Sequence, residues 1–290
     1  MDAFSKCHPA VNFLYFAGVI VMAVVIQHPA FLLAGVITGG LYYLLLNGKK
    51  GWKTILRLIP MFLLLAAVNP LLNTLGSTTL FYVFGRPYTR QALAYGMAVG
   101  GVFVVIVLWF GCYNKVLTGD KFTALFGNFI PSISLLLVMV LRLLPNFISR
   151  TKQIVNARKS IGKGAGEKAT NREKLQDSAT VLGAMTTWAL EGSVVTGDSM
   201  RARGYGTAKR TNFMIYRMTA TDWVLLAVMA GLLGLAVMAA CLGQTAAVFV
   251  PDVQTASVSW GLAAYTGYLL IPTVLHIKEA LVWRISRSKI

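Results

Sequence analysis

The chain has 290 residues, of which 56% are hydrophobic and only 13% are charged. Because soluble domains carry about 25% charged residues, this composition excludes an ordinary soluble protein and indicates that the lipid bilayer is the solvent. The formal net charge is +17, but the basic residues flank apolar segments and do not alternate with aromatic ones. We therefore expect anionic lipid headgroups, and no nucleic acid, as the partner of this charge.

Six segments are long enough to cross a membrane, since a spanning helix needs roughly 17–25 mostly apolar residues. They cover residues 10–26, 30–46, 55–72, 92–112, 223–242 and 258–277. The sequence Gln27-His28-Pro29 predicts a tight turn between the first two. Pro60 and Pro70 interrupt the third segment, and such breaks persist at membrane depth only where neighbouring groups satisfy the freed backbone atoms.

The distribution of lysine and arginine predicts the orientation of these segments. Residues 243–257 hold none, whereas residues 113–221 hold sixteen. The positive-inside rule therefore places residues 113–221 and both termini in the cytoplasm. We expect an all-α integral membrane protein with transmembrane helices one to four in residues 1–112, a cytoplasmic domain in residues 113–221, and helices five and six with a cytoplasmic tail in residues 222–290.

The region 113–221 lacks the pattern of a soluble domain. Its continuous apolar run, residues 135–141, is too short to span a bilayer. On a helix, one stripe collects apolar residues at spacings of three, four and seven: Ile133, Leu137, Val140, Leu144, Phe147 and Ile154. The pattern predicts an amphipathic helix over about 132–161, lying along or just beneath the membrane, and ended by the glycines of residues 162–166.

A second long helix is predicted to begin at Thr170. Thr170 and Glu173 have the spacing of a capping box, and an apolar stripe continues to Met200. The small residues Ala189 and Gly192 on this stripe would let another helix approach closely. We therefore expect a coupling domain of two long crossed amphipathic helices and one short one, the short one over about 119–130.

Residues that could perform chemistry are scarce. Residues 162–168 are rich in glycine but lack the spacing of a phosphate-binding loop, so we interpret them as a connector. No predicted span has Asp, Glu, Lys or Arg in its core, because Asp222 and Glu279 lie at span edges. This argues against a proton relay and against acid–base catalysis in the membrane. No histidine or cysteine cluster indicates a metal site, and we expect a protein that is not an enzyme.

Two stretches 42 positions apart end alike. Residues 157–162 read Ala-Arg-Lys-Ser-Ile-Gly, and residues 199–204 read Ser-Met-Arg-Ala-Arg-Gly. Cations stabilise helix C-termini by about 0.3–1 kcal/mol each, which is one explanation of the basic residues. The other is docking, because a guanidinium pairs bidentately with carboxylates and an acidic groove on a partner would receive it. Within the chain, Glu191 and Asp198 are candidate partners of Arg158 or Arg201.

At these residues the chain resembles the T component of energy-coupling factor (ECF) transporters of the cobalt/cobalamin type. Ala202-Arg203-Gly204 matches the Ala-Arg-Gly motif with which that family ends each of two crossed coupling helices. Supporting matches are Trp188-Ala189-Leu190-Glu191, Asp198, Arg210-Thr211, His8-Pro9, Asn12-Phe13, Asn69-Pro70-Leu71 and Asp120-Lys121-Phe122. The first motif departs from the pattern: Ser160-Ile161-Gly162 stands where Ala-Arg-Gly is expected, and a register shifted by three would use Ala157-Arg158 instead.

The resemblance implies partners. Each coupling-helix tip would dock on one of two ABC-type ATPases, identical or different, through Arg158, Lys159, Ser160 and Gly162 at the first tip and Arg201, Ala202, Arg203 and Gly204 at the second. ATP and Mg²⁺ would be bound by those ATPases, and no cofactor by this chain. A small substrate-binding membrane subunit (S component) would contact Leu136, Leu137, Val140, Leu144, Val181, Met185 and Trp188. The complex would import a vitamin or a metal ion across a prokaryotic cell membrane.

Two other classes of function remain as alternatives. A secondary transporter or channel acting alone needs charged or polar residues inside its spans, and these are scarce here. Transport by the purified chain in liposomes without an ATPase would favour it. An intramembrane enzyme needs a catalytic cluster that the sequence does not contain.

Overall fold

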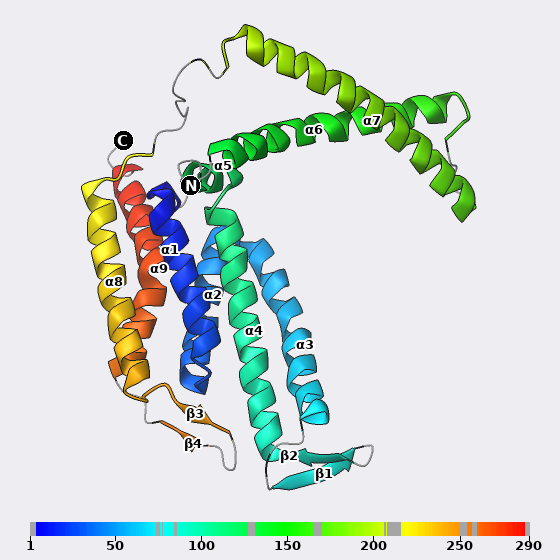
Figure 1. The fold of residues 1–290 in the computed structure, drawn as a ribbon. Helices are drawn as coiled ribbons and strands as arrows, with labels where there is room; N and C mark the ends of the chain where they lie inside the picture. Colours follow the sequence, from blue (N-terminus) through cyan, green and yellow to red (C-terminus); the bar gives the residue numbers. More distant parts are fainter. Residues whose placement is uncertain are drawn as a thin grey trace. The chain divides into compact units, whose positions relative to one another are not determined.

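The computed structural model describes residues 4–73, 76, 78–83, 86–126, 131–164, 170–205, 207, 216–249, 254–256 and 260–287. The chain forms two compact units. The first, here called the membrane unit, comprises Met1–Phe122 and Tyr216–Ile290. The second, here called the two-helix unit, comprises Thr123–Ile215. Almost all of the regular structure in both units is helical (Figure 1).

Each of the six predicted spans coincides with a helix of the membrane unit to within two residues at the ends where the span extends beyond it. Their bounds are α1 Pro9–Val25, α2 Pro29–Asn47, α3 Lys49–Leu72, α4 Arg90–Val116, α8 Ala220–Cys241 and α9 Trp260–Arg287. Within the described residues, four of them are long and apolar enough to cross a membrane: α2, α3, α4 and α8. Helix α1 is apolar but shorter, at 17 residues, and α9 is not among the four. The structure is thus that of an all-α protein with four candidate membrane-spanning helices.

Helix α9 carries tyrosine and threonine side chains that lie inside the membrane unit. The Tyr268 hydroxyl donates to the Tyr15 carbonyl at 3.0 Å, and the Tyr15 hydroxyl donates to the Leu269 carbonyl at 3.1 Å. These reciprocal hydrogen bonds tie α1 to α9 and satisfy both buried hydroxyls, as an apolar surrounding requires. Tyr268 of α9 and Tyr15 of α1 therefore join these two helices.

The beginnings of α1 and α2 share one local structure. Each is preceded by histidine and starts with proline, in the repeated sequence His-Pro-Ala. The His8 Nδ1 accepts from the Ala10 N–H and the His28 Nδ1 from the Ala30 N–H, both at 3.2 Å. Proline fits the first helical position because its missing N–H has no helical partner there. The turn predicted at residues 27–29 is confirmed, since α1 ends at Val25 and α2 begins at Pro29.

An aromatic cluster forms the centre of the membrane unit. The Tyr15 ring lies 5.1 Å from that of Tyr268 and 5.9 Å from that of Trp109. The indole N–H of Trp109 donates to the Gly35 carbonyl of α2 at 3.2 Å. A Cβ at Gly39 would lie 2.8 Å from that indole nitrogen, so this glycine lets α2 and α4 approach. Small residues at helix contacts are typical of membrane proteins.

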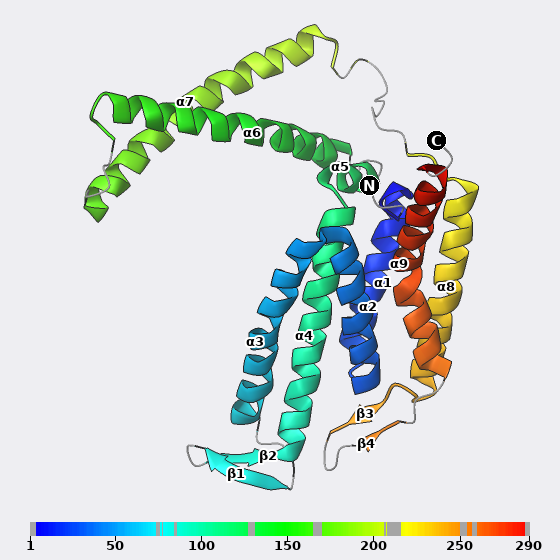
Figure 2. The same cartoon turned by 180° about the vertical axis from the view of Figure 1, so that it is seen from behind.

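Two short hairpins lie in segments where we predicted only loops. Strands β1 (Thr79–Val83) and β2 (Arg86–Thr89) are antiparallel, as are β3 (Ala247–Val248) and β4 (Gln254–Thr255). Both hairpins lie at the end of the membrane unit where α2 and α4 begin (Figures 1 and 2), which we call the hairpin end. At the opposite end, a 3₁₀ helix that precedes α1 (Phe4–Lys6) is joined to α9 by the Lys6–Glu279 ion pair.

The two-helix unit consists of two long helices, α6 (Pro131–Ser160) and α7 (Asn171–Ala202). The short helix α5 (Gly119–Phe126) precedes them and continues the chain from the membrane unit. The bounds match the helices predicted over 132–161 and from Thr170, and the backbone N–H of Thr170 donates to Glu173 Oε2 at 2.9 Å, as the capping box requires.

Candidate functional site

The C-termini of α6 and α7 have the same backbone structure. After each helix comes a glycine with positive φ, +70° at Gly162 and +75° at Gly204. At the first, the N–H groups of Gly162 and Lys163 donate to the carbonyls of Lys159 and Arg158. At the second, those of Gly204 and Tyr205 donate to Arg201 and Met200 in the same pattern. Both ends are Schellman motifs, in which glycine avoids the cost of a left-handed conformation.

This equivalence confirms the sequence register that aligns the two glycines. Ile161 occupies the position that Arg203 occupies in α7, and Ser160 the position of Ala202. The Ile161 side chain is 68% exposed, and Arg203 is exposed as well. The chain therefore presents two tips with one backbone geometry and two chemistries, one apolar and one cationic.

Arg158 is engaged inside the unit. Its Nε donates to Asp177 Oδ1 at 2.7 Å, a second guanidinium nitrogen lies 2.7 Å from the same oxygen, and that nitrogen also donates to the Lys163 carbonyl at 3.2 Å. Our expectation that Glu191 or Asp198 would be its partner was wrong, because the carboxylate that Arg158 meets is that of Asp177, 14 residues before Glu191 on α7. Arg158 thus fixes the end of α6 to α7.

Unlike Arg158, the exposed basic residues of the tips form no ion pair within the described part of the chain. Lys159, Arg201 and Arg203 are exposed, and their side chains have no hydrogen-bond or acidic partner within the described part of the chain. The pair at Asp177 and the end of α7 at Ala202 are 25 residues apart on one helix, which is about 38 Å at 1.5 Å per residue. The two tips are therefore separate surfaces and cannot form one binding site.

Aromatic and apolar side chains hold α6 against α7. The rings of Phe147 and Trp188 meet edge to face at 5.2 Å, and the Arg150 guanidinium lies 5.8 Å from the centre of the Trp188 ring. Val181 and Met185 are buried. These two residues, which we predicted to contact a substrate-binding subunit, are largely covered within the unit, and that contact stays a prediction. They stabilise the contact between the two helices.

Beyond that contact, both helices expose large apolar side chains. On α6 these are Leu136, Val138, Val140, Leu141, Leu143, Leu144 and Ile148, and on α7 they include Leu182, Leu190, Val194 and Val195. A cavity of about 410 Å³ lies between the helices, lined by Phe147, Met185, Ala189 and neighbouring residues. Large apolar side chains exposed in this number on two neighbouring helices are typical of a site of contact with a protein or a membrane. Leu136, Val140 and Leu144 of the predicted contact set are part of it.

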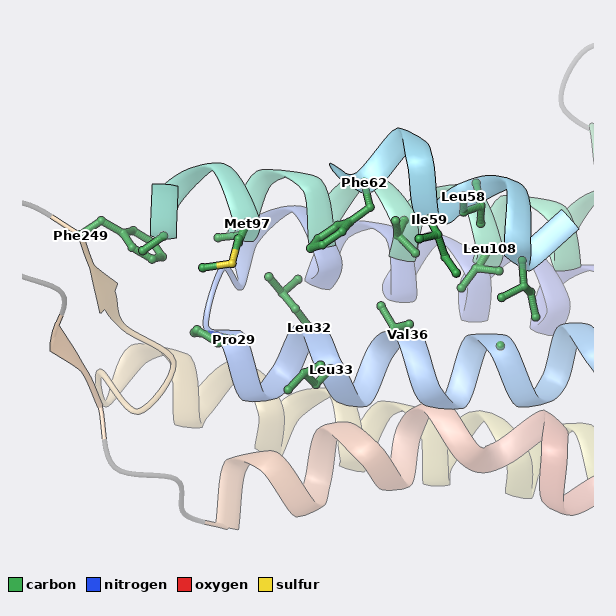
Figure 3. Close-up of a pocket in the computed structure, with 16 residues that line it drawn as sticks. Pro29, Leu32, Leu33, Val36, Leu58, Ile59, Phe62, Met97, Leu108 and Phe249 are labelled. Carbon is green, nitrogen blue, oxygen red and sulfur yellow. The ribbon is translucent and has the colours of Figure 1, made fainter. Parts of the chain in front are cut away.

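A second cavity, of about 600 Å³, lies in the membrane unit between α2, α3 and α4. Its lining is apolar, with Leu32 and Val36 from α2, Phe62 from α3 and Met97 from α4 facing it (Figure 3). Sequence reasoning missed this site, although Gly40 and Gly101 on its walls are the small residues that leave room there.

Groups that could perform chemistry are not brought together in the described residues. No group of three or more His, Cys, Asp or Glu side chains that could hold a metal ion occurs among them. The buried Asp222 accepts from the Thr219 N–H and hydroxyl at 2.9 and 2.8 Å and from the His8 N–H at 3.2 Å. These bonds cap α8 and attach the start of α1 to it, which is a structural role.

Sequence comparison adds no relative: no protein-family model matches the chain, and no curated protein matches it either. The class of protein is defined by the structure alone. It is an all-α protein whose apolar helices suit a membrane, carrying a unit of two long helices with matched glycine-ended tips.

Proposed function

We propose that this chain is the membrane-embedded coupling subunit, or T component, of an ECF-type ABC importer. Two ABC-type ATPases would dock on the tips of α6 and α7, and ATP-driven movement of the pair would reach a small substrate-binding membrane subunit through these helices. The chain would bind no nucleotide itself. It would cross the prokaryotic cell membrane six times, with both termini and residues 113–221 in the cytoplasm.

One observation carries this proposal. Two helices end in the same Schellman motif about 38 Å apart, and one of the ends carries the sequence Ala-Arg-Gly, which resembles the family's docking motif. Arg203 has no partner among the described residues, so its five donors are available to an acidic groove. Two equivalent tips suit a pair of ATPases better than a single partner.

The chemistry of the tips supports unequal contacts. Arg203 suits a groove lined by carboxylates, whereas Ile161 would lose the energy of hydrophobic burial in such a groove and suits an apolar one. Lys159 and Lys163, each two residues from Ile161, supply exposed positive charge at the first tip. The exposed residues Leu136, Val140 and Leu144 would contact the substrate-binding subunit.

The test is to purify the tagged full chain from its own host in mild detergent and to identify by mass spectrometry what comes with it. We expect one or two ABC-type ATPases and a small membrane protein. Arg203→Ala should remove most of the ATPase. Arg142→Ala, which deletes an exposed arginine of α6 18 residues before Ser160, is the matched control and should retain it. Normal ATPase recovery with Arg203→Ala, or substrate transport by the chain alone in liposomes, would contradict the proposal.

A further inference from the structure

The cavity between α2, α3 and α4 is a groove with a buried floor and an exposed rim. Leu32, Ala98 and Leu108 form the floor and are buried, whereas Leu33 and Met97 on the rim are exposed. Figure 3 shows the side chains of α2 facing those of α3 and α4 across this space, with Phe249 at one end. The groove therefore opens sideways from the helices, toward the surroundings of the membrane unit.

The size of the groove decides between two kinds of occupant. It follows α2 from Pro29 to Gly40, a length of about 16 Å at 1.5 Å per residue. A helix of that length and about 10 Å diameter fills roughly 1,300 Å³, twice the 600 Å³ of the groove. The groove therefore suits an occupant thinner than a helix. Since the hydrocarbon core is about 30 Å thick, the length of the groove matches one leaflet, which is the depth of a lipid acyl chain.

A positive charge lies beyond one end of the groove. Arg90 precedes Ala94 by four residues on α4, so it falls on the groove-lining face one turn nearer the hairpin end. It is exposed, and within the described residues its side chain has no partner. The described carboxylates of the membrane unit belong to other sites: Asp222 bonds to His8, Glu279 pairs with Lys6, and Asp120 starts α5.

We propose that this groove is a binding site for a glycerophospholipid, with one acyl chain along α2 and the phosphate on Arg90. The apolar wall, which is as long as one leaflet is thick, matches an acyl chain, and the cation at its end matches the phosphate. The paired charge and the buried chain would hold it more tightly than the lipids that surround the protein. This site is independent of the coupling function proposed above, because it lies wholly within the membrane unit.

The structure offers a variant that fills the groove without displacing protein atoms. A Cβ at Gly40 would meet only Ile55 Cδ1, at 4.0 Å, so the side chain of Gly40→Leu has open space to enter. Gly234 on α8 has no atom within 4 Å of its Cβ position and does not line the groove. Gly234→Leu is therefore a matched control with the same change in size and helix propensity.

The experiment measures lipid retained by the delipidated full chain in mild detergent, by native mass spectrometry, on titration with palmitoyl-oleoyl phosphatidylglycerol. We expect wild type and Gly234→Leu to hold one lipid tightly and Gly40→Leu to bind it at least tenfold more weakly. Arg90→Gln should weaken binding about tenfold, as expected for one charge-assisted hydrogen bond. Arg57→Gln, which replaces an exposed arginine toward the other end of the unit, should leave lipid binding unchanged.

Two results would overturn the proposal. One is equal lipid retention by Gly40→Leu and Gly234→Leu. The other is a cysteine at Val36 that cross-links in native membranes to a second membrane protein, which would make the groove a helix-docking site. If Gly40→Leu does not fold, Met97→Trp narrows the rim from an exposed position and should give the same loss of lipid.

Discussion

The ion pair between Arg158 and Asp177 should control the stability of the α6 tip while leaving the α7 tip unchanged. The side chains are 22% and 18% exposed, between the fully exposed pairs that contribute about 0.2–1 kcal/mol and the buried pairs whose disruption costs about 3–5 kcal/mol. We therefore expect a coupling energy of about 1–2 kcal/mol from a double-mutant cycle with Arg158→Ala and Asp177→Ala.

Hydrogen exchange of the full chain in detergent measures the stability of the α6 tip residue by residue. The amides of Ile161, Gly162 and Lys163 close the last turn of α6, and 1–2 kcal/mol corresponds to exchange about 5–30 times faster. Arg158→Ala should have the larger effect, because it also removes the hydrogen bond to the Lys163 carbonyl, worth about 0.5–1.5 kcal/mol more.

The α7 tip supplies an internal control. The amides of Gly204 and Tyr205 lie about 38 Å from the pair along α7, so their exchange should not change. Arg172→Ala removes an exposed arginine without touching the pair and should leave both tips unchanged. The reasoning is refuted if exchange at residues 161–163 is the same in Asp177→Ala as in wild type, or if both tips exchange faster by the same factor.

Gly204→Ala should destabilise the end of α7 by about 1–2 kcal/mol, because φ of +75° is left-handed and the new Cβ would lie 3.3 Å from Thr207 Oγ1. Gly162→Ala has open space at its Cβ, so it should destabilise the end of α6 by no more than Gly204→Ala destabilises the end of α7. Hydrogen exchange at the two tips measures both effects, and a larger acceleration at the α6 tip would contradict this prediction. His28→Ala should lower the thermal midpoint in detergent more than His8→Ala, because His28 caps α2 and its Nε2 also bonds to the Ala256 carbonyl at 3.1 Å. Equal midpoints would contradict a role for that second bond.

The sequence predicted those parts of the structure that depend on neighbouring residues. The apolar lengths located the helices, and the Thr170–Glu173 spacing located the start of α7. The aligned glycines predicted two equivalent helix ends because a Schellman motif is completed within six residues. Each of these signals depends on residues close together in the sequence, so it can be recognised without knowledge of the tertiary fold.

The errors concern contacts between segments. The partner of Arg158 depends on how α6 lies against α7, which the packing of Phe147 on Trp188 decides. The two hairpins consist of strands of two to five residues, too short to show a periodic pattern. The tyrosines of α9 lower its hydropathy, and only the structure shows that the Tyr268 hydroxyl bonds to α1.

The exposed apolar residues of α6 and the Arg203 tip of α7 differ in the binding free energy that each can contribute. Leu136, Leu144, Val140, Ile148 and Val138 are between 46% and 62% exposed. Completing the burial of five such side chains, at about 1.5–3 kcal/mol for each full burial, would contribute roughly 4–8 kcal/mol. A single charge-assisted hydrogen bond at Arg203 contributes about 1.5–3 kcal/mol. Under the proposed function, the apolar contact would therefore hold the substrate-binding subunit more tightly than the Arg203 contact alone holds an ATPase. Arg203, which needs a carboxylate at one position, would decide where that ATPase docks.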